Sequence, residues 1–285
     1  MHDCDVIIKS AGEMASGIAV RLHKAGFRRI LMLEISEPLA VRRNVSFCEA
    51  VYQGSQSVEG VFGRLARDRA GVEHVWLGGD IAVVVDPLWR LVTEFSPVML
   101  VDAIIAKRNL GTTMEDAPVV VALGPGFTAG VDAHCVVETN RGHNLGSIYT
   151  HGTAAPNTGI PGPIGGCTLE RVLRAKAAGN VQCMRALGDM VTEGEVVFVV
   201  DGQETRAAIS GVLRGCIRPG LFVPKGAKLG DIDPRGRTAY CHSISEKARA
   251  LGGSVLEILC AKIAGYESPG LPYMQGDSPR LGQPG

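Results

Sequence analysis

The sequence predicts an α/β protein in which a parallel sheet covered by helices is followed by a smaller all-β unit. Two observations carry this prediction. In the first third of the chain, short β-branched runs (residues 6–8, 30–35, 81–85 and 98–101) alternate with amphipathic or polar stretches, a rhythm typical of β–α–β units. From about residue 180 the pattern changes to short valine-rich segments separated by turn signals.

Individual elements follow from local signals. Runs such as Ile81 to Val85 are apolar throughout because strands of a parallel sheet are covered on both faces. The first helix should cover residues 13–25, and residues 119–123 should form the last strand of this sheet. Residues 168–178 are expected to form a short helix with Thr168 as its cap.

Later in the chain, Asp201-Gly202 should turn a hairpin, and the capping-box spacing of Ser243 and Glu246 should open a helix interrupted at Gly252-Gly253. The expected boundaries are residues 1–179 for the α/β domain, with a functional segment at 124–167, then 180–236 for the β unit, 237–267 for a C-terminal helical segment and 268–285 for a flexible tail.

Composition excludes several classes of protein. The chain has 285 residues, and 29 Lys and Arg balance 29 Asp and Glu, so its formal net charge is zero. Balanced charge gives no bulk reason to expect a nucleic-acid partner. No run approaches roughly 18 apolar residues, and the polar N-terminus lacks a signal-peptide pattern. We therefore expect a cytoplasmic protein that binds neither nucleic acid nor a membrane.

The eight cysteines contain no C-x-x-C pair, which argues against a zinc ribbon, an iron–sulfur cluster or a redox dithiol. Histidines and cysteines between residues 134 and 167 offer nitrogen and sulfur atoms, but their spacing matches no metal-ligand pattern, and we expect no metal site. Cys167, ahead of the expected helix, is the best candidate for a reactive thiol, because a helix N-terminus lowers a thiol pKa. The alternative is an inert, packed cysteine.

A strand, a turn of small residues and a helix start follow one another over residues 6–17. This order is close to the G-x-G-x-x-G/A fingerprint of Rossmann-like domains, whose backbone must approach a pyrophosphate. Glu34, 22 residues beyond Gly12, could accept from ribose hydroxyls. The candidate ligand-binding residues are Ser10, Ala11, Gly12, Ala15, Gly17 and Glu34. Alternatively, the small residues only allow helix–strand packing.

The segment 124–167 is rich in glycine, proline and polar residues, which favours a functional loop. Gly124 and Gly126 follow an expected strand, so their amides could form a second anion-binding nest. The absence of a following GK[ST] excludes a standard P-loop. Arg42-Arg43 could neutralise a phosphate or an acidic substrate, or could simply be surface.

Five residues are candidates for catalysis. Glu138, Arg141 and His143 lie between glycines and could supply a general base, an anion clamp and a proton donor. Asp102 and Lys107 lie at or after the end of a strand, where α/β proteins place ligand-facing residues. The alternatives are a surface turn satisfied by its own side chains and, for Lys107, plain surface.

Several segments together resemble the YqeB-type family of selenium-dependent molybdenum hydroxylase system proteins. They are residues 10–17, 123–130, 138–146, 230–235 and 244–248. The resemblance implies an accessory protein for maturation or cofactor supply of such a hydroxylase, with the hydroxylase client or its maturation machinery as partner. It also implies a nucleotide or molybdenum-cofactor-like ligand. The family usually opens Gly-Ala-Gly-Asp-Leu-Ala-Thr-Gly, from which Ser10, Glu13, Met14 and Ser16 depart.

The β unit resembles a biotinyl/lipoyl-type barrel-sandwich, with residues 188–191 and 220–223 like its two related turns. The hairpin that would carry a modified lysine has Asp201-Gly202-Gln203-Glu204 instead, so a docking module is expected rather than a swinging-arm carrier.

Two other functions compete with the accessory role. In an NAD(P)-dependent oxidoreductase, Glu34 would favour an unphosphorylated ribose and His143 or Lys107 would donate a proton. A non-catalytic scaffold would require only the fold.

Overall fold

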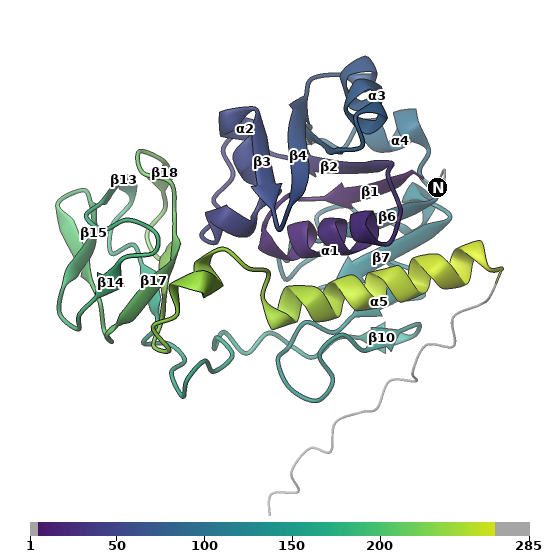
Figure 1. Cartoon of the computed structure of the whole chain (residues 1–285). Helices are drawn as coiled ribbons and strands as arrows, with labels where there is room; N and C mark the ends of the chain where they lie inside the picture. The colour runs from purple at the N-terminus through teal and green to yellow at the C-terminus, as the bar shows by residue number, and fades with distance from the viewer. Residues whose placement is uncertain (1–4, 266–285) are drawn as a thin grey trace, which may run out of the picture.

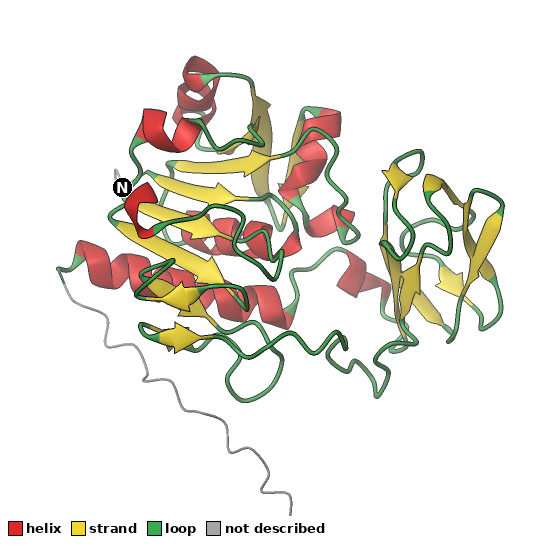
Figure 2. Ribbon diagram, turned by 180° about the vertical axis from the view of Figure 1, so that it is seen from behind, coloured by secondary structure: helices red, strands yellow, loops and turns green. Residues whose placement is uncertain are grey.

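The computed structural model describes residues 5–265, which form a large sheet covered by helices and a separate unit of small antiparallel sheets (Figures 1 and 2). The large sheet has the order β10-β9-β7-β6-β1-β2-β5-β4-β3. Neighbouring strands from β9 to β4 are parallel, and the edge strands β10 and β3 are antiparallel. Its strands are β1 (Val6–Lys9), β2 (Ile30–Glu34), β3 (Ser55–Val58), β4 (Val61–Ala66), β5 (Ile81–Val85), β6 (Met99–Asp102), β7 (Val119–Leu123), β9 (Cys135–Val137) and β10 (Ile148–Tyr149).

Helices cover both faces of this sheet. Alternate residues of the parallel strands pack against α1 (Glu13–Lys24) and α5 (Glu246–Ile263) on one face. The remaining residues pack on the other face against α3 (Arg69–Leu77) and α4 (Leu91–Phe95). A short helix, α2 (Ala50–Gln53), lies beside the β3–β4 hairpin. The central strands are apolar except for Lys9, Glu34 and Asp102 at their carboxyl ends, because both faces of the sheet are covered, as the sequence predicted.

Helices α1 and α5 lie side by side (Figure 1) and approach closely at glycines. A Cβ on Gly17 would lie 2.7 Å from the Cβ of Ala248, and one on Gly252 would lie 3.0 Å from the Cβ of Arg21. The prediction that Gly252-Gly253 interrupts the last helix is therefore wrong. The helix is continuous, and its N-cap is Ser245 rather than Ser243.

The β unit consists of two four-stranded antiparallel sheets, β12-β19-β17-β14 and β16-β15-β13-β18, which enclose their own apolar core. Its strands are β12 (Val172–Arg174), β13 (Gly179–Cys183), β14 (Met190–Val191), β15 (Val196–Val200), β16 (Gln203–Arg206), β17 (Gly211–Cys216), β18 (Phe222–Val223) and β19 (Lys228–Asp233). The hairpin prediction is confirmed: Asp201 and Gly202 connect β15 to β16 with φ of 47° and 69°.

Three local predictions are wrong because tertiary pairing overrides local preference. No helix forms over residues 168–178, since Leu173 is buried and pairs with Gly230 in β12–β19. The stretch expected to be a mixed helical region between β2 and β5 also contains the β3–β4 hairpin. After β7 the sheet continues through β9, and a small pair, β8 (Thr128–Ala129) with β11 (Gly152–Thr153), lies beside it. The expected tail at 268–285 lies outside the described residues.

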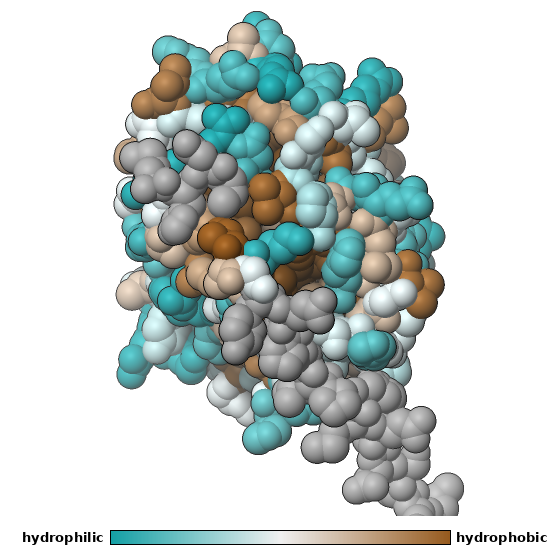
Figure 3. Space-filling view, turned by 90° about the vertical axis from the view of Figure 1, so that its right-hand side faces the viewer, coloured by the Kyte–Doolittle hydropathy of each residue, from teal (hydrophilic) through white to brown (hydrophobic). Residues whose placement is uncertain are grey.

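The carboxyl ends of the parallel strands point toward the β unit (Figure 2). On the opposite side, apolar side chains show as separate patches among hydrophilic ones (Figure 3). Within residues 5–265, every helix is too short or too polar to cross a membrane. The side of the sheet that faces the β unit is therefore the place to look for a site, because α/β sheets bind ligands at their carboxyl edge.

Candidate anion-binding site

A cavity of about 280 Å³ lies at this carboxyl edge, and we call it the cationic cavity. Loops after β6, β7 and β9 form one part of its wall, and residues 155–162 form another. The β unit and α5 complete it. Five cationic side chains line it, and none of the described lining residues is acidic. These cations are Lys107, Arg141, Arg171, Arg174 and Lys247.

Two of these cations, Arg141 and Arg171, are held in place by ion pairs and hydrogen bonds. Arg141 Nε donates to Glu246 Oε1 at 2.8 Å. Arg171 forms an ion pair with Asp231 and donates from Nη2 to the Gly162 carbonyl at 3.1 Å. Both side chains of the Arg171–Asp231 pair are almost fully buried, at 5% and 2% exposure. Buried, paired arginines are fixed in orientation, so the wall of the cavity is largely preorganised.

Within residues 5–265, the two lysines of the lining, Lys107 and Lys247, lack the side-chain partners that hold Arg141 and Arg171. Neither the Lys107 nor the Lys247 ammonium forms a hydrogen bond or ion pair with another side chain in the described part of the chain. Burial, followed by repulsion from Arg141, lowers the pKa of Lys247 to about 8. An anion that binds beside Lys247 would stabilise the charged ammonium, because its negative charge offsets both the burial and the repulsion from Arg141.

Two glycines let the loops of this wall approach each other. Gly126 has φ of +106°, and a Cβ there would lie 2.5 Å from the Arg108 backbone nitrogen. Gly124 has φ of +76°, and a Cβ there would lie 2.5 Å from Thr139 Oγ1. The Gly124 amide donates to the Val137 carbonyl at 2.8 Å, so this predicted nest amide already has a partner. Both glycines therefore shape the cavity wall through close packing.

The predicted catalytic residues divide between the cavity and its surroundings. Lys107 and Arg141 line it. Glu138 is buried behind it, where its carboxylate accepts from the amides of Asn140 at 2.6 Å and Ala155 at 2.7 Å. His143 is exposed and lies outside the lining. Glu138 thus positions both loops of the wall, and the structure does not bring the expected proton donor to the same point.

Asp102 belongs to a different buried cluster at the end of β6. Its carboxylate accepts from Thr112 Oγ1 at 2.7 Å and from the Ile104 amide at 3.2 Å, and burial raises its pKa. Lys9, which the sequence reasoning missed, donates to Thr112 at 2.8 Å and to Asp116 at 3.0 Å. Its ammonium lies 4.2 Å from the centre of the Trp89 ring. The sequence offered one signal for this cluster: Lys9 is a charged residue at the end of an otherwise apolar strand.

The loop at residues 10–12 is bonded within the chain. The Ala11 amide donates to Glu34 Oε2 at 2.8 Å, and the Gly12 amide donates to Ser10 Oγ at 3.1 Å. The other Glu34 oxygen accepts from the Ile35 amide at 2.9 Å, and burial raises the pKa of this carboxyl. Ser10 adopts φ of 93°, which favours glycine. The amides that the fingerprint directs at a pyrophosphate therefore have partners, and Ala15 of α1 is buried in the core between this helix and the sheet.

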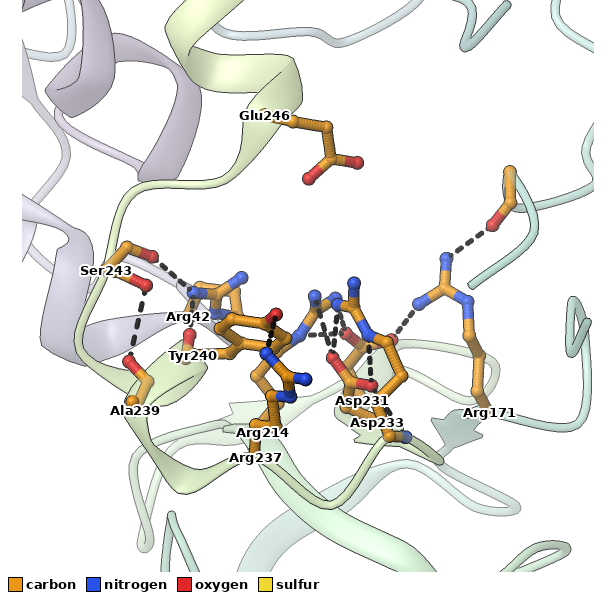
Figure 4. A network of polar contacts seen from close by, with 12 residues as sticks. Arg42, Arg171, Arg214, Asp231, Asp233, Arg237, Ala239, Tyr240, Ser243 and Glu246 are labelled. Atoms are coloured by element: carbon orange, nitrogen blue, oxygen red, sulfur yellow. Dashed lines mark hydrogen bonds and ion pairs between the residues drawn. The ribbon is translucent and has the colours of Figure 1, made fainter. Parts of the chain in front are cut away.

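A second cavity, of about 380 Å³, adjoins the first around Tyr240, and we call it the Tyr240 cavity (Figure 4). The two are linked through shared partners, because Asp231 binds both Arg171 and Arg214. The Arg235 guanidinium lies 4.5 Å from the centre of the Tyr240 ring. The lining residues are Arg42, Arg214, Arg235, Tyr240, Ser243, Ile244, Ser245, Glu246 and Arg249.

Arg42 and Arg43 make contacts that hold parts of the chain together. Arg42 is buried and donates to the carbonyls of Tyr240 at 2.8 Å and Ser243 at 3.0 Å. It also binds Glu13 at 3.2 Å. Arg43 Nε donates to the Cys216 carbonyl at 2.7 Å. Both arginines therefore fasten the β unit and the segment before α5 to the rest of the molecule.

Metal and thiol candidates are also placed by the structure. No three His, Cys, Asp or Glu side chains among residues 5–265 are grouped so that they could hold a metal ion. Cys167 is partly exposed, and the helix expected to lower its pKa is replaced by turns and β12. The reason given for its reactivity is therefore wrong.

Comparison with known proteins gives one strong similarity. No protein-family model matches the sequence. The chain is 50% identical over 254 residues to a protein of Escherichia coli (strain K12) named "Uncharacterized protein YqeB". The match covers 89% of this chain and 47% of that protein, so the chain spans about half the length of its relative.

Similarity to solved structures is weak. The ectoine utilization protein EutE (DoeB) from Ruegeria pomeroyi, in its apo structure, shares 11% identity over 80% of this chain and 86% of its own, with a TM-score of 0.24. An aspartoacylase family protein from Mesorhizobium loti shares 19% identity over 24% of each chain, with a TM-score of 0.22. Scores this low carry no argument about fold or function.

Proposed function

We propose that this chain binds a phosphate-bearing nucleotide or nucleotide-like cofactor in the cationic cavity, as an accessory protein in the maturation or cofactor supply of a molybdenum hydroxylase. One observation carries the binding part: cations from the sheet loops, the β unit and α5 surround one cavity whose described lining has no acidic residue. Arginine and lysine donors are strong partners for phosphate oxygens, because charge-assisted hydrogen bonds exceed neutral ones in strength.

Strand order supports a Rossmann-like interpretation of the large sheet. Six of its parallel strands run β5-β2-β1-β6-β7-β9, which corresponds to the order 3-2-1-4-5-6 of dinucleotide-binding sheets, and β4 of the β3–β4 hairpin adds a seventh parallel strand beside β5. Ligands of such sheets bind outside the carboxyl ends of the strands. The cationic cavity lies at that edge, beyond β6, β7 and β9.

The Tyr240 cavity supports a ligand with two chemically different ends. Its aromatic ring and neighbouring guanidinium can stack on a planar heterocycle, and the Glu246 carboxylate can accept from amino groups of such a ring. Because Glu246 also binds Arg141 of the cationic cavity, one ligand could place its phosphate at Arg141 and its heterocycle beside Tyr240. A nucleotide or a phosphorylated pterin has this division.

Sequence similarity supports the accessory role. Half of the aligned residues are identical to YqeB of Escherichia coli, and the segments at 10–17, 123–130 and 138–146 resemble YqeB-type proteins. In this role the β unit, as a barrel-sandwich-like docking module, would meet the hydroxylase or its maturation machinery. The competing NAD(P)-dependent oxidoreductase receives less support, because the amides of Ala11 and Gly12 already have partners.

The proposal is tested by the thermal stability of the full chain in the presence of NAD, NADP, ATP, CTP or a molybdopterin-type compound. A ligand at 100 times its Kd should stabilise the protein by about 2.7 kcal/mol. The variant Lys247→Gln should lose roughly half of this shift, as expected for a tenfold weaker Kd. Its matched control is Lys262→Gln, an exposed lysine near the other end of α5.

The outcomes separate the candidate functions. Stabilisation by NAD alone would favour the oxidoreductase, whereas stabilisation by ATP, CTP or the pterin would favour cofactor maturation. A shift that both variants retain would exclude the cationic cavity as the site. The absence of any shift would overturn ligand binding and leave a partner-binding scaffold.

A further inference from the structure

Two cysteines that are distant in sequence meet inside the β unit. Cys183 ends β13 and Cys216 ends β17, so they belong to different sheets of the unit. Their sulfur atoms lie 3.8 Å apart, and both thiols lie 3.5 Å from the Ile217 carbonyl oxygen. The spacing between them in the sequence gives no sign of this contact.

The two thiols are not equivalent. Cys183 is partly exposed, whereas Cys216 is buried. The contact with Cys216 lowers the pKa of Cys183, and contact with Cys183 followed by burial raises the pKa of Cys216. The accessible sulfur is therefore also the one that ionises first, which is the arrangement of an attacking thiol beside a resolving thiol.

We propose that Cys183 and Cys216 form a reversible disulfide that joins the two sheets of the β unit, with a low-molecular-weight disulfide as oxidant. The Cys183 thiolate attacks one sulfur of that disulfide, forming a mixed disulfide and releasing one thiolate. Cys216 then gives up its proton and attacks the Cys183 sulfur, releasing the second small thiol. Both protein thiols are oxidised, and the small disulfide is reduced to two thiols.

The position of the pair connects this chemistry to the rest of the molecule. The Cys216 amide donates to the Val41 carbonyl at 2.8 Å, and its carbonyl accepts from Arg43 Nε at 2.7 Å. Val41 and Arg43 belong to the segment that follows β2 of the large sheet. Oxidation of Cys216 would therefore act at the junction between the β unit and the α/β part.

The experiment uses the full reduced chain, equilibrated with oxidised glutathione and then blocked with N-ethylmaleimide. Tryptic peptides 177–185 and 215–225, which contain Cys183 and Cys216, should appear cross-linked with the loss of two hydrogens. Excess reduced glutathione should restore the separate peptides. Cys167 and Cys260, the first partly exposed and the second exposed, serve as internal controls that should not join this cross-link.

Two variants give opposite and diagnostic results. In Cys216→Ser the mixed disulfide should accumulate on Cys183, because no second thiol resolves it. In Cys183→Ser the buried Cys216 should stay unmodified. The proposal fails if wild-type protein retains glutathione on Cys183 as its end product, or if Cys260 reacts while Cys183 and Cys216 remain free. Wild-type mapping decides this even where a variant folds poorly.

Discussion

Two regions at the same edge of the large sheet differ in a way that decides where a ligand fits. The loop after β1 has the order of a dinucleotide fingerprint, but its amides bind Glu34 and Ser10. The loops after β6, β7 and β9 match no fingerprint, yet they surround a cavity lined by five cations. Small residues in a turn permit an anion to approach, whereas cations that line a cavity without acidic neighbours in its described lining attract one. The cluster of cations is therefore a stronger indicator of a ligand site than the small residues of the fingerprint loop.

The largest expected effect comes from removing the Asp231 carboxylate, which forms ion pairs with an arginine of each cavity. Asp231→Ala would leave Arg171 and Arg214 buried without their shared carboxylate and should lower the free energy of unfolding by about 3–5 kcal/mol. Urea denaturation measures this loss. Glu73→Gln, which breaks an exposed helix pair with Arg69, should cost roughly 0.5 kcal/mol or less. Similar losses for both variants would show that the buried Asp231 network contributes no more to stability than an exposed ion pair.

Close loop packing accounts for the next effect. Gly126→Ala would force a Cβ into the Arg108 backbone at a residue with φ of +106°, and should cost about 1–3 kcal/mol. Gly142→Ala, also at positive φ but with open space around its Cβ, should cost less. Thermal unfolding compares them. Equal losses of stability would mean that the positive φ, rather than the contact with Arg108, explains why glycine is required at position 126.

Ligand binding gives the most direct contrast between the two regions. Lys107→Gln should weaken binding of the stabilising ligand roughly tenfold, since one charge-assisted contact contributes about 1.5 kcal/mol. Gly12→Ala should leave it nearly unchanged, because the added Cβ meets Ser10 Oγ at an ordinary 3.5 Å. Isothermal titration calorimetry measures both. The reverse pattern would place the ligand on the fingerprint loop.

The smallest effect concerns pH. Because the pKa of Lys247 is lowered to about 8, its charge is largely present at pH 7 and is lost as pH rises through 8. Affinity for a phosphate ligand should therefore decline between about pH 7 and pH 9, and Lys247→Gln should flatten that decline. An equally steep decline in the variant would assign the titration to another group.

Part of the fold could be predicted from the sequence because it depends on local patterns. Helix α1, the strands β1, β2, β5, β6 and β7, and the hairpin at Asp201-Gly202 each carry their periodicity or turn residues within a few positions. The helix expected over 168–178 was wrong, because Leu173 gains more from pairing with Gly230 in β19 than from a local helix. Local preference is weak where a distant strand supplies the partner.

The candidate site shows the same division. Lys107 was predicted from its place after a strand and Arg141 from the polar residues that lie between glycines, and both line the cationic cavity. Arg171, Arg174 and Lys247 join them from the β unit and α5, and no spacing in the sequence relates them.

By itself, the sequence determined helix α1, the strands β1, β2, β5, β6 and β7, and the hairpin at Asp201-Gly202, since their patterns lie within short stretches of the chain. Only the tertiary structure decided that the loop after β1 uses its amides internally, that five cations share one cavity, and that Cys183 meets Cys216. Those outcomes depend on contacts between residues far apart in the chain, and such contacts are set by how whole elements pack.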